Sequence, residues 1–203
     1  MTTITPSVRR SVLADRVFPR SLALDAVLVV AGAALVTILA QVAIPLWPVP
    51  VTGQTLAVLL VGSTLGAARG AISMALYAVL GILGLPVFSD GTHGFGVIAG
   101  PTGGYIVGFI LSAALVGLLA ERSWDRKVLK AIVTFVAGSV AVFAIGLPWL
   151  GVYLASVGAP HDLNAVLVGG LYPFLIGGAI KAAIAAALLP LAWWGAGKLA
   201  KRN

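Results

Sequence analysis

PVFSDGTHGFGVIAGPTGGYIVGF, which spans residues 86–109, joins a polar, glycine-rich loop directly to an apolar helix. Glycine lets the main chain approach a small molecule closely, and the free N–H groups at the start of a helix favour an anion. Asp90 and His93 are two of the few titratable side chains outside the basic segments of the chain. This stretch therefore predicts a ligand-binding loop at the mouth of an apolar bundle. The residues expected to contact the ligand there are Asp90, His93, Thr102, Gly103, Gly104 and Tyr105.

The composition of the chain places this loop in a membrane protein. Of 203 residues, 60% are hydrophobic and only 9% are charged, which is more apolar surface than one soluble domain can bury. The length allows about six helical spans of about 20 residues with short connections. We therefore predict an all-α integral membrane protein with one membrane domain over residues 21–196 and tails at 1–20 and 197–203. The absence of cysteine excludes a disulfide framework.

Lys and Arg residues give the predicted topology, because they mark the cytoplasmic side of a membrane protein. Of the thirteen in the chain, all but one lie in the two tails, the turn at Arg69 or the charged turn at 121–130. Both termini are therefore predicted to be cytoplasmic, in the plasma membrane, with the loops 46–54, 86–104 and 151–170 facing outward. The predicted spans are residues 22–45, 55–67, 71–85, 105–120, 131–150 and 171–194, of which the second and third form a tight helical hairpin.

The remaining basic residue, Lys181, lies inside the sixth predicted span. A lone charged side chain within a membrane helix costs about 2.5–3.5 kcal/mol on insertion scales, and that span holds no acid to pair with it. Two explanations stay open. Either Lys181 extends its ammonium along its own stem to the outer interface, or an anionic or carbonyl-bearing ligand in an outward cavity completes its coordination.

The glycines of GPTGG (100–104) also have two explanations. They expose amide groups to a carboxylate, or Gly103, Gly104 and Gly108 allow helices to pack closely. The nearby GFGVIA (94–99) fits a dinucleotide-binding pattern, but no strand or βαβ unit surrounds it, so it does not predict a nucleotide site.

Several function classes lack the residues that they need. The chain has two histidines and no cysteine, so no metal site and no cofactor are predicted. It contains no P-loop motif and no paired nucleophile and base, so neither ATP hydrolysis nor intramembrane catalysis is predicted. Its basic residues lie beside the apolar segments, which indicates a lipid surface and not a nucleic acid as their partner.

Five stretches of the chain carry a family resemblance. They are AQVAIPL (40–46), PVPVTGQTLAVLLVG (48–62), RGAISMALYAVLGILGLPVF (69–88), GPTGGYIVGF (100–109) and YPFLIGGAIKAAIAAALLP (172–190). In order and spacing they resemble the BioY family, the biotin-specific substrate-binding (S) components of energy-coupling factor (ECF) importers. The stretches cover five of the six predicted spans, and GPTGGY after GLPVF is specific to this group.

The resemblance implies a six-helix bundle that binds biotin near the outer face, under the loop after the first helix. It implies no enzyme activity in this chain, because a separate transmembrane coupling protein and two cytoplasmic ATPases complete the importer. A face of small residues on the first helix, Ala33, Thr37 and Ala40, is then expected to dock the coupling protein, although packing inside the bundle also explains such faces.

One position departs from the family pattern. The last motif commonly reads PFLPGDxxK, and here Gly178 replaces the acid, whereas Lys181 is kept. An acid and a lysine at this spacing share a helix face and offer the ligand an acceptor and a donor. Without the acid, the ureido N–H groups of biotin need another acceptor, such as Gln54 or a loop carbonyl, or the ligand or its affinity has changed.

The leading hypothesis is therefore a biotin-capturing importer subunit. Lys181 and the GPTGG amides are expected to hold the carboxylate or the ureido carbonyl, and the apolar parts of biotin to pack on Tyr105, Tyr172 and Phe174. The alternative is a stand-alone secondary transporter or facilitator of biotin or another small carboxylate vitamin. Secondary transporters often have inverted repeats and intramembrane acids for ion coupling, and the sequence shows neither.

Overall fold

The computed structural model describes residues 12–19 and 21–199. Most of the predicted cytoplasmic tails, residues 1–11 and 200–203, lies outside the described residues. The long elements are the helices α2 (Leu22–Ala40), α3 (Gln54–Leu65), α4 (Ala67–Ile82), α6 (Gly103–Glu121), α7 (Val128–Ser156) and α9 (Tyr172–Leu199). The short ones are α1 (Leu13–Val17), β1 (Ala43–Ile44), β2 (Val51–Thr52), η1 (Ser89–Gly91), α5 (Phe95–Ala99), η2 (Trp124–Arg126) and α8 (Leu163–Gly170).

Four helical segments are long and apolar enough to cross a membrane, so the chain is a multi-pass membrane protein. A crossing takes about 20 residues, whereas α3 has 12 residues and α4 has 16. The prediction of six spans is therefore not confirmed. The four segments are Leu22–Ala40, Gly103–Glu121, Val128–Ser156 and Leu163–Gly197, the last of which joins α8 and α9.

The structure departs from the predicted all-α class between α2 and α3. There β1 and β2 form an antiparallel pair in which Ala43 lies opposite Thr52. Prolines at 45, 48 and 50 cannot donate a backbone hydrogen bond and stop helix formation, which explains why α2 ends before the predicted boundary. The chain instead returns as a short hairpin over the start of α3.

The predicted outward loop at 151–170 is also wrong in part, because most of it is helical. α7 continues to Ser156, since the apolar sequence GVYLAS holds no proline that would end the helix. α8 then begins after Asp162, whose carboxylate accepts a hydrogen bond from the Ala165 amide at 3.0 Å, an N-cap interaction that stabilises a helix start. Only residues 157–162 connect the two helices.

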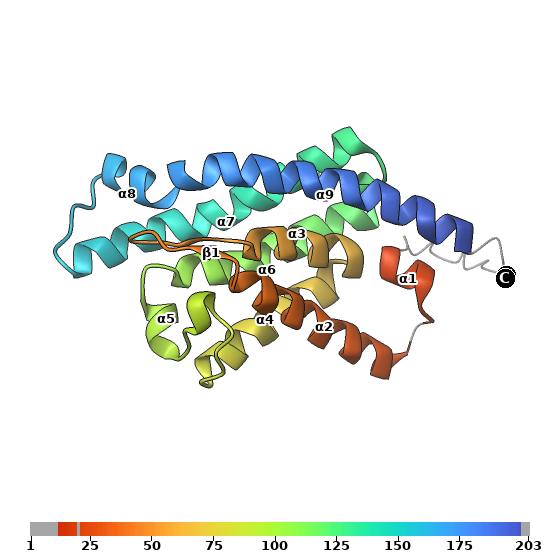
Figure 1. Cartoon of the computed structure of the whole chain (residues 1–203), viewed down its shortest axis with the longest axis horizontal. Coiled ribbons are helices and arrows are strands. Elements are labelled where there is room, and N and C mark those ends of the chain that lie inside the picture. The colour runs from red at the N-terminus through yellow and green to blue at the C-terminus, as the bar shows by residue number, and fades with distance from the viewer. Residues whose placement is uncertain (1–11, 20, 200–203) are drawn as a thin grey trace, which may run out of the picture.

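α6 is the central helix of the bundle. It packs against α3, α4 and α7. Of the apolar stretch of α6, 61% is buried within the bundle, compared with 17% of the apolar stretch of α2. Close approach depends on small residues: a Cβ added at Gly117 would lie 2.3 Å from the Ala67 amide nitrogen. Figure 1 shows α7 and α9 running side by side along the bundle, with α5, α8 and the β1–β2 hairpin toward one end and α1 at the other.

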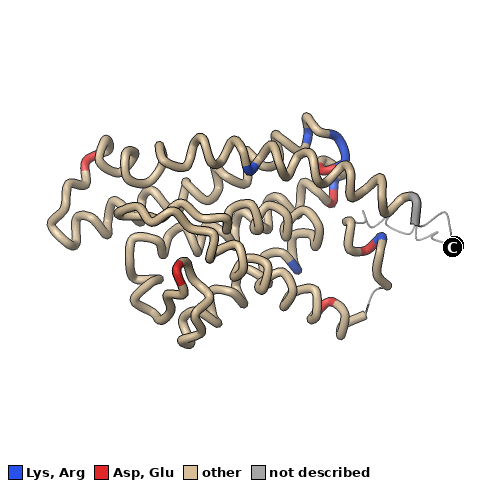
Figure 2. The backbone as a smooth tube through the Cα atoms, in the orientation of Figure 1, with Lys and Arg blue, Asp and Glu red and all other residues tan. Residues whose placement is uncertain are grey.

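Basic residues gather toward the end of the bundle at which the described chain begins and ends (Figure 2). At that end the guanidinium of Arg69 donates to Asp15 Oδ1 at 2.7 Å and to Asp25 Oδ1 at 2.9 Å. We call these three residues the arginine cluster. It connects α1, α2 and α4, so the short N-terminal helix is held to the bundle by charge.

A buried carboxyl group lies near the same end, in η2. Asp125 is 0% exposed, and its Oδ2 accepts from Trp193 Nε1 at 2.6 Å. The guanidinium of Arg126 lies 4.1 Å from the centroid of the Trp193 ring. Burial raises the pKa of the Asp125 carboxyl above its ordinary value, an effect that the Trp193 hydrogen bond partly offsets. These contacts attach the end of α9 to the turn between α6 and α7.

Candidate functional site

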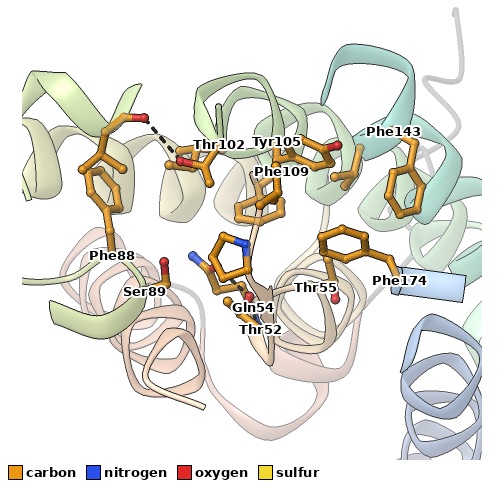
Figure 3. Close-up of a pocket in the computed structure, with 15 residues that line it drawn as sticks. Thr52, Gln54, Thr55, Phe88, Ser89, Thr102, Tyr105, Phe109, Phe143 and Phe174 are labelled. Atoms are coloured by element: carbon orange, nitrogen blue, oxygen red, sulfur yellow. Dashed lines mark hydrogen bonds between the residues drawn. The ribbon is translucent and has the colours of Figure 1, made fainter. Parts of the chain in front are cut away.

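A small pocket, which we call the central pocket, lies where the β1–β2 hairpin, α3, α6, α7 and α9 meet. Its volume is about 40 Å³, enough for a few water molecules but far below the roughly 300–1,000 Å³ of a small-molecule site. Figure 3 shows Phe143 and Phe174 at one end and Phe88 and Ser89 at the other. The lining residues are Val49, Pro50, Thr52, Gln54, Thr55, Phe88, Ser89, Val97, Thr102, Tyr105, Ile106, Phe109, Val142, Phe143 and Phe174.

Gln54 lines this pocket at the first position of α3. Its side-chain amide donates to the Tyr77 hydroxyl at 2.5 Å, and its carbonyl oxygen accepts from the Thr52 hydroxyl at 2.7 Å. Only 7% of Gln54 is exposed. Gln54 therefore ties the end of β2 to α4, and both ends of its amide are engaged within the chain.

Lys181 projects from α9 toward the start of α3. Its ammonium donates to the backbone carbonyl of Thr52 and to the Thr55 hydroxyl, the latter at 3.0 Å. Thr52 and Thr55 both line the central pocket. These two acceptors, both neutral, hold the Lys181 side chain against the start of α3.

Three aromatic rings form the wall of the pocket beside α7 and α9. Tyr105 and Phe174 are stacked with their centroids 6.0 Å apart, and Phe143 meets Phe174 edge-on at 5.9 Å. The Tyr105 hydroxyl donates to the Gly170 carbonyl at 2.9 Å, so that its polar end is satisfied. The remaining surface of these rings is suited to an apolar ligand.

A second cavity of about 300 Å³ adjoins the pocket, and we call it the vestibule. Asp90 lines it from η1, with a left-handed φ of 55°. Gln41 fixes this turn, because its side chain accepts from the Gly91 amide at 3.0 Å and donates to the Phe88 carbonyl at 3.1 Å. The residues that the vestibule shares with the central pocket are Pro50, Ser89, Val97 and Thr102.

Two of the three glycines of the GPTGGY segment, Gly103 and Gly104, are explained by packing. A Cβ at Gly103 would lie 1.7 Å from the Ile98 carbonyl oxygen, and one at Gly104 would lie 2.3 Å from the Cβ of Trp149. The Gly103 amide also donates to the Gly100 carbonyl at 3.3 Å. Of this segment, Thr102 and Tyr105 line the central pocket.

Other predicted residues lie away from the pocket. His93 is an exposed loop residue, and Tyr172 is 50% exposed; neither lines the central pocket or the vestibule. On α2, Ala33 is 2% and Ala40 is 0% exposed, and the Thr37 hydroxyl donates to the Ala33 carbonyl at 3.0 Å. The small residues of α2 therefore pack within the chain.

Most of the residues that line the central pocket were not predicted from the sequence, among them Thr52, Thr55, Phe109 and Phe143. Thr52 and Thr55 lie close to Gln54 in the sequence VTGQT. Their closeness to a predicted site residue could have indicated that they also line the site. Phe109 and Phe143 lie in continuous apolar runs, where nothing in the sequence separates a pocket residue from a packing residue. The completed site offers one ammonium, neutral hydrogen-bonding groups and aromatic surface, which is suited to binding an amphipathic molecule.

The sequence of this chain is similar to those of known proteins. The model of the BioY family matches residues 10–198 of this chain. The chain belongs to the BioY family. Its relatives are transporters and not enzymes: the biotin transporter BioY of Thermotoga maritima is 39% identical over 153 residues, which are 75% of this chain and 86% of that protein. The biotin transporter BioY of Rhizobium etli is 38% identical over 148 residues, 70% of this chain and 76% of that protein.

One solved structure shares the fold of this BioY family member. It is the crystal structure of the S-component for biotin from an ECF-type ABC transporter, which superposes with a TM-score of 0.71 at 24% sequence identity. The match covers 83% of this chain and 89% of that chain. The helical architecture is therefore that of an ECF S component.

Proposed function

We propose that this chain captures biotin as the substrate-binding subunit of an energy-coupling factor importer. The position of the Lys181 ammonium carries the proposal: its acceptors among the described residues are neutral, and they lie at the edge of a pocket walled by aromatic rings. The names of the related transporters support biotin as the ligand.

The central pocket holds a partner for each part of biotin. The stacked Tyr105 and Phe174 rings pack on the apolar ring and chain, and Lys181 donates to the carboxylate or the ureido carbonyl. Gln54 and Thr102 provide oxygen atoms for the ureido N–H groups in place of the acid that Gly178 replaces. In this proposal Asp90 lies at the entrance, the GPTGG backbone frames the pocket, and His93 and Tyr172 make no direct contact.

Binding requires the pocket to open. Biotin is larger than a cavity of about 40 Å³, and Val49, Pro50 and Thr52 of the short β1–β2 hairpin line this cavity. Lys181 and Gln54 hold the end of β2 through Thr52. We infer that biotin replaces the Thr52 carbonyl as a partner of Lys181 and that the hairpin shifts to admit it.

Transport in this proposal needs partners. The chain contains no P-loop, so a transmembrane coupling protein and two cytoplasmic ATPases provide the energy. The gathering of Lys and Arg at one end supports plasma-membrane topology with both termini cytoplasmic (Figure 2), with α3 and α4 as two short crossings among six. Docking of the coupling protein on Ala33, Thr37 and Ala40 requires α2 to move, because both alanines are buried.

Calorimetric titration of the detergent-purified chain with biotin, without partners or ATP, tests the proposal. We expect saturable binding with a Kd of about 1 µM or lower. Lys181→Ala should weaken binding by at least about tenfold, because a hydrogen bond to a charged group contributes about 1.5–3 kcal/mol.

The matched control is Lys130→Ala. Lys130 lies in the first turn of α7, with its ammonium 5.6 Å from the centroid of the Trp124 ring, and this variant should bind biotin as the parent does. A folded parent chain that binds no biotin at micromolar concentrations would refute the function. Biotin uptake by cells that lack any coupling protein and ATPases would favour a stand-alone transporter.

A further inference from the structure

The turn between α6 and α7 carries a concentration of exposed positive charge. α6 ends at Glu121 and α7 begins at Val128, and both helices are long and apolar enough to cross a membrane. The turn therefore lies at a membrane surface. Four exposed basic side chains on it form what we call the basic patch: Arg122, Arg126, Lys127 and Lys130.

The two acids of this turn are engaged with other elements of the bundle. Glu121 accepts a hydrogen bond from the Ala67 amide, at the start of α4, at 2.9 Å. Asp125 is 0% exposed and accepts from the Trp193 indole of α9. Four cations against two acids give residues 121–130 a net charge of +2, and the charged side chains that are exposed there are cations.

Two indole rings lie against the basic patch. The Arg126 guanidinium is 4.1 Å from the centroid of the Trp193 ring, and the Lys130 ammonium is 5.6 Å from that of Trp124. A cation that contacts an aromatic ring keeps its charge, so both side chains still attract an anion. Tryptophan is enriched where lipid headgroups meet the hydrocarbon of a bilayer. The rings therefore favour a position of the patch at the level of the headgroups.

Apolar side chains continue the patch along the first turn of α7. Val128 is 54% and Leu129 is 75% exposed, and they lie between Lys127 and Lys130 in the sequence. Exposed apolar surface rimmed by polar residues marks an interaction site. Cations beside aliphatic side chains are complementary to a phosphate group that carries an acyl chain, whereas a free phosphate ion uses the cations alone.

The arginine cluster, at the same end of the bundle, shows how the chain compensates a cation by itself. Its guanidinium is paired with two carboxylates, at 2.7 and 2.9 Å. In the basic patch the cations outnumber the acids, and Figure 2 shows Lys and Arg gathered at this turn. The negative surface of an anionic membrane attracts such basic segments beside a span, so the lipid supplies the charge that the turn lacks.

We propose that the basic patch binds the headgroup of an anionic phospholipid, with an acyl chain lying along Val128 and Leu129. The phosphate neutralises the excess positive charge, and the bound lipid holds the α6–α7 turn at the membrane surface. This assignment goes beyond the proposed function and makes no use of biotin. Either of the two can therefore fail while the other stands.

Native mass spectrometry of the detergent-purified chain tests the assignment, by titration with phosphatidylglycerol and with phosphatidylcholine of the same acyl chains. Both lipids have a phosphate, but only phosphatidylglycerol has a net negative charge, so the parent should bind it at least about tenfold more tightly. The double variant Lys127→Gln/Lys130→Gln should lose at least about tenfold in phosphatidylglycerol affinity. Its phosphatidylcholine affinity and its biotin Kd should match those of the parent. Raising the ionic strength from about 0.05 to about 0.5 M should reduce the preference of the parent, because salt screens exposed charges.

Arg16→Gln is the matched control for the single variant Lys130→Gln. Arg16 is an exposed cation on α1 outside the patch, so Arg16→Gln should bind phosphatidylglycerol as the parent does, whereas Lys130→Gln should bind it about threefold or more weakly. Equal binding of the two lipids by the parent, or unchanged phosphatidylglycerol binding by the double variant, would overturn the proposal. Equal losses in Arg16→Gln and Lys130→Gln would overturn it too, because charge at this end would then act without a defined site. Displacement of the lipid by an equal concentration of inorganic phosphate would assign the patch to a free anion instead.

Discussion

Arg69 and Lys181 are both cations held inside the helical bundle, but their surroundings differ. Arg69 donates to the carboxylates of Asp15 and Asp25 and to the Leu65 carbonyl, at 2.7, 2.9 and 2.8 Å. Lys181 donates to a backbone carbonyl and a hydroxyl group. The chain supplies the counter-charge for the arginine, whereas the acceptors that it supplies for the lysine carry no charge.

This difference separates a structural cation from a binding cation. A charge that is taken out of water needs an opposite charge and satisfied hydrogen bonds to be stable there. The arginine cluster meets both conditions and connects α1, α2 and α4. Among the described residues Lys181 meets only the second, and in the proposed function an anionic ligand meets the first. The two residues should therefore respond in opposite ways to the same substitution.

The largest effect on stability is expected from Arg69→Met. The change leaves the two carboxylates without the arginine that bridges them, and breaking a buried pair costs about 3–5 kcal/mol. Because the Asp25 side chain is 42% exposed, solvent screening reduces this to about 2–4 kcal/mol. Thermal unfolding in detergent should show a Tm lower by several degrees, with the biotin Kd within twofold of the parent.

The graded control for this prediction is Arg69→Lys. Lysine keeps the charge but cannot reproduce the two-pronged guanidinium geometry, so its Tm should fall between those of the parent and Arg69→Met. A Tm of Arg69→Met equal to that of the parent would mean that the arginine cluster contributes nothing to stability. Arg69 would then not be a structural cation.

Lys181→Met should have a smaller effect on stability, and of the opposite sign. Removing a charge from the middle of a membrane helix recovers about 2.5–3.5 kcal/mol on insertion scales, and leaving the Thr52 carbonyl without this donor costs about 1–3 kcal/mol. The unfolding free energy should therefore stay the same or rise by up to about 2 kcal/mol, while biotin binding is lost.

Thermal unfolding and biotin titration of the same Lys181→Met preparation check this pair of outcomes. A Tm that falls as far as that of Arg69→Met would show that Lys181 is a structural residue like Arg69. The distinction between the two cations would then be wrong, whatever the effect on affinity.

The sequence predicted the helical membrane architecture because apolar composition and periodic charge follow directly from the membrane environment. It predicted the wrong helix boundaries where contacts between distant parts of the chain, and not local sequence signals, determine where a helix ends. α7 runs on to Ser156 and α8 fills much of a predicted loop, because apolar residues after Leu150 remain helical without a breaking signal. The β1–β2 hairpin was missed because two-residue strands leave too short a pattern to detect.

For the candidate site, the sequence predicted residues whose chemistry is unusual for their surroundings. Lys181 stands out because a charge within an apolar segment is rare, and Gln54 and Tyr105 lie in recognisable motifs. Phe143 could not be found, because an aromatic residue in an apolar helix has the same pattern whether it faces a pocket, a neighbour or lipid. His93 is an exposed loop residue that lines neither the central pocket nor the vestibule, so its contact with a ligand stays a prediction.

The smallest predicted effect concerns Asp125. It is a buried ionisable residue, like Arg69 and Lys181, but its surroundings differ from theirs. Burial raises the pKa of this carboxyl group, so the folded state holds its proton more tightly than the unfolded state. The stabilisation is then complete below the ordinary pKa of 3.8 and is lost as pH rises through the raised value. Asp125→Asn keeps an oxygen acceptor for the Trp193 indole but cannot titrate. At pH 7 its stability should equal that of the parent or exceed it by up to about 1 kcal/mol.

The measurement is the Tm of the parent minus that of Asp125→Asn, followed from pH 4 to pH 8, and it should decrease as pH rises. Asp162→Asn is the control, because asparagine caps a helix about as well as aspartate and Asp162 is exposed at the start of α8; its Tm difference should not change in this way with pH. A difference that grows with pH would instead mean that Asp125 is ionised and stabilised by the neighbouring Arg126. Asp125 would then belong with the arginine cluster, as a charge that the chain compensates itself, and Lys181 would stand alone among these three residues.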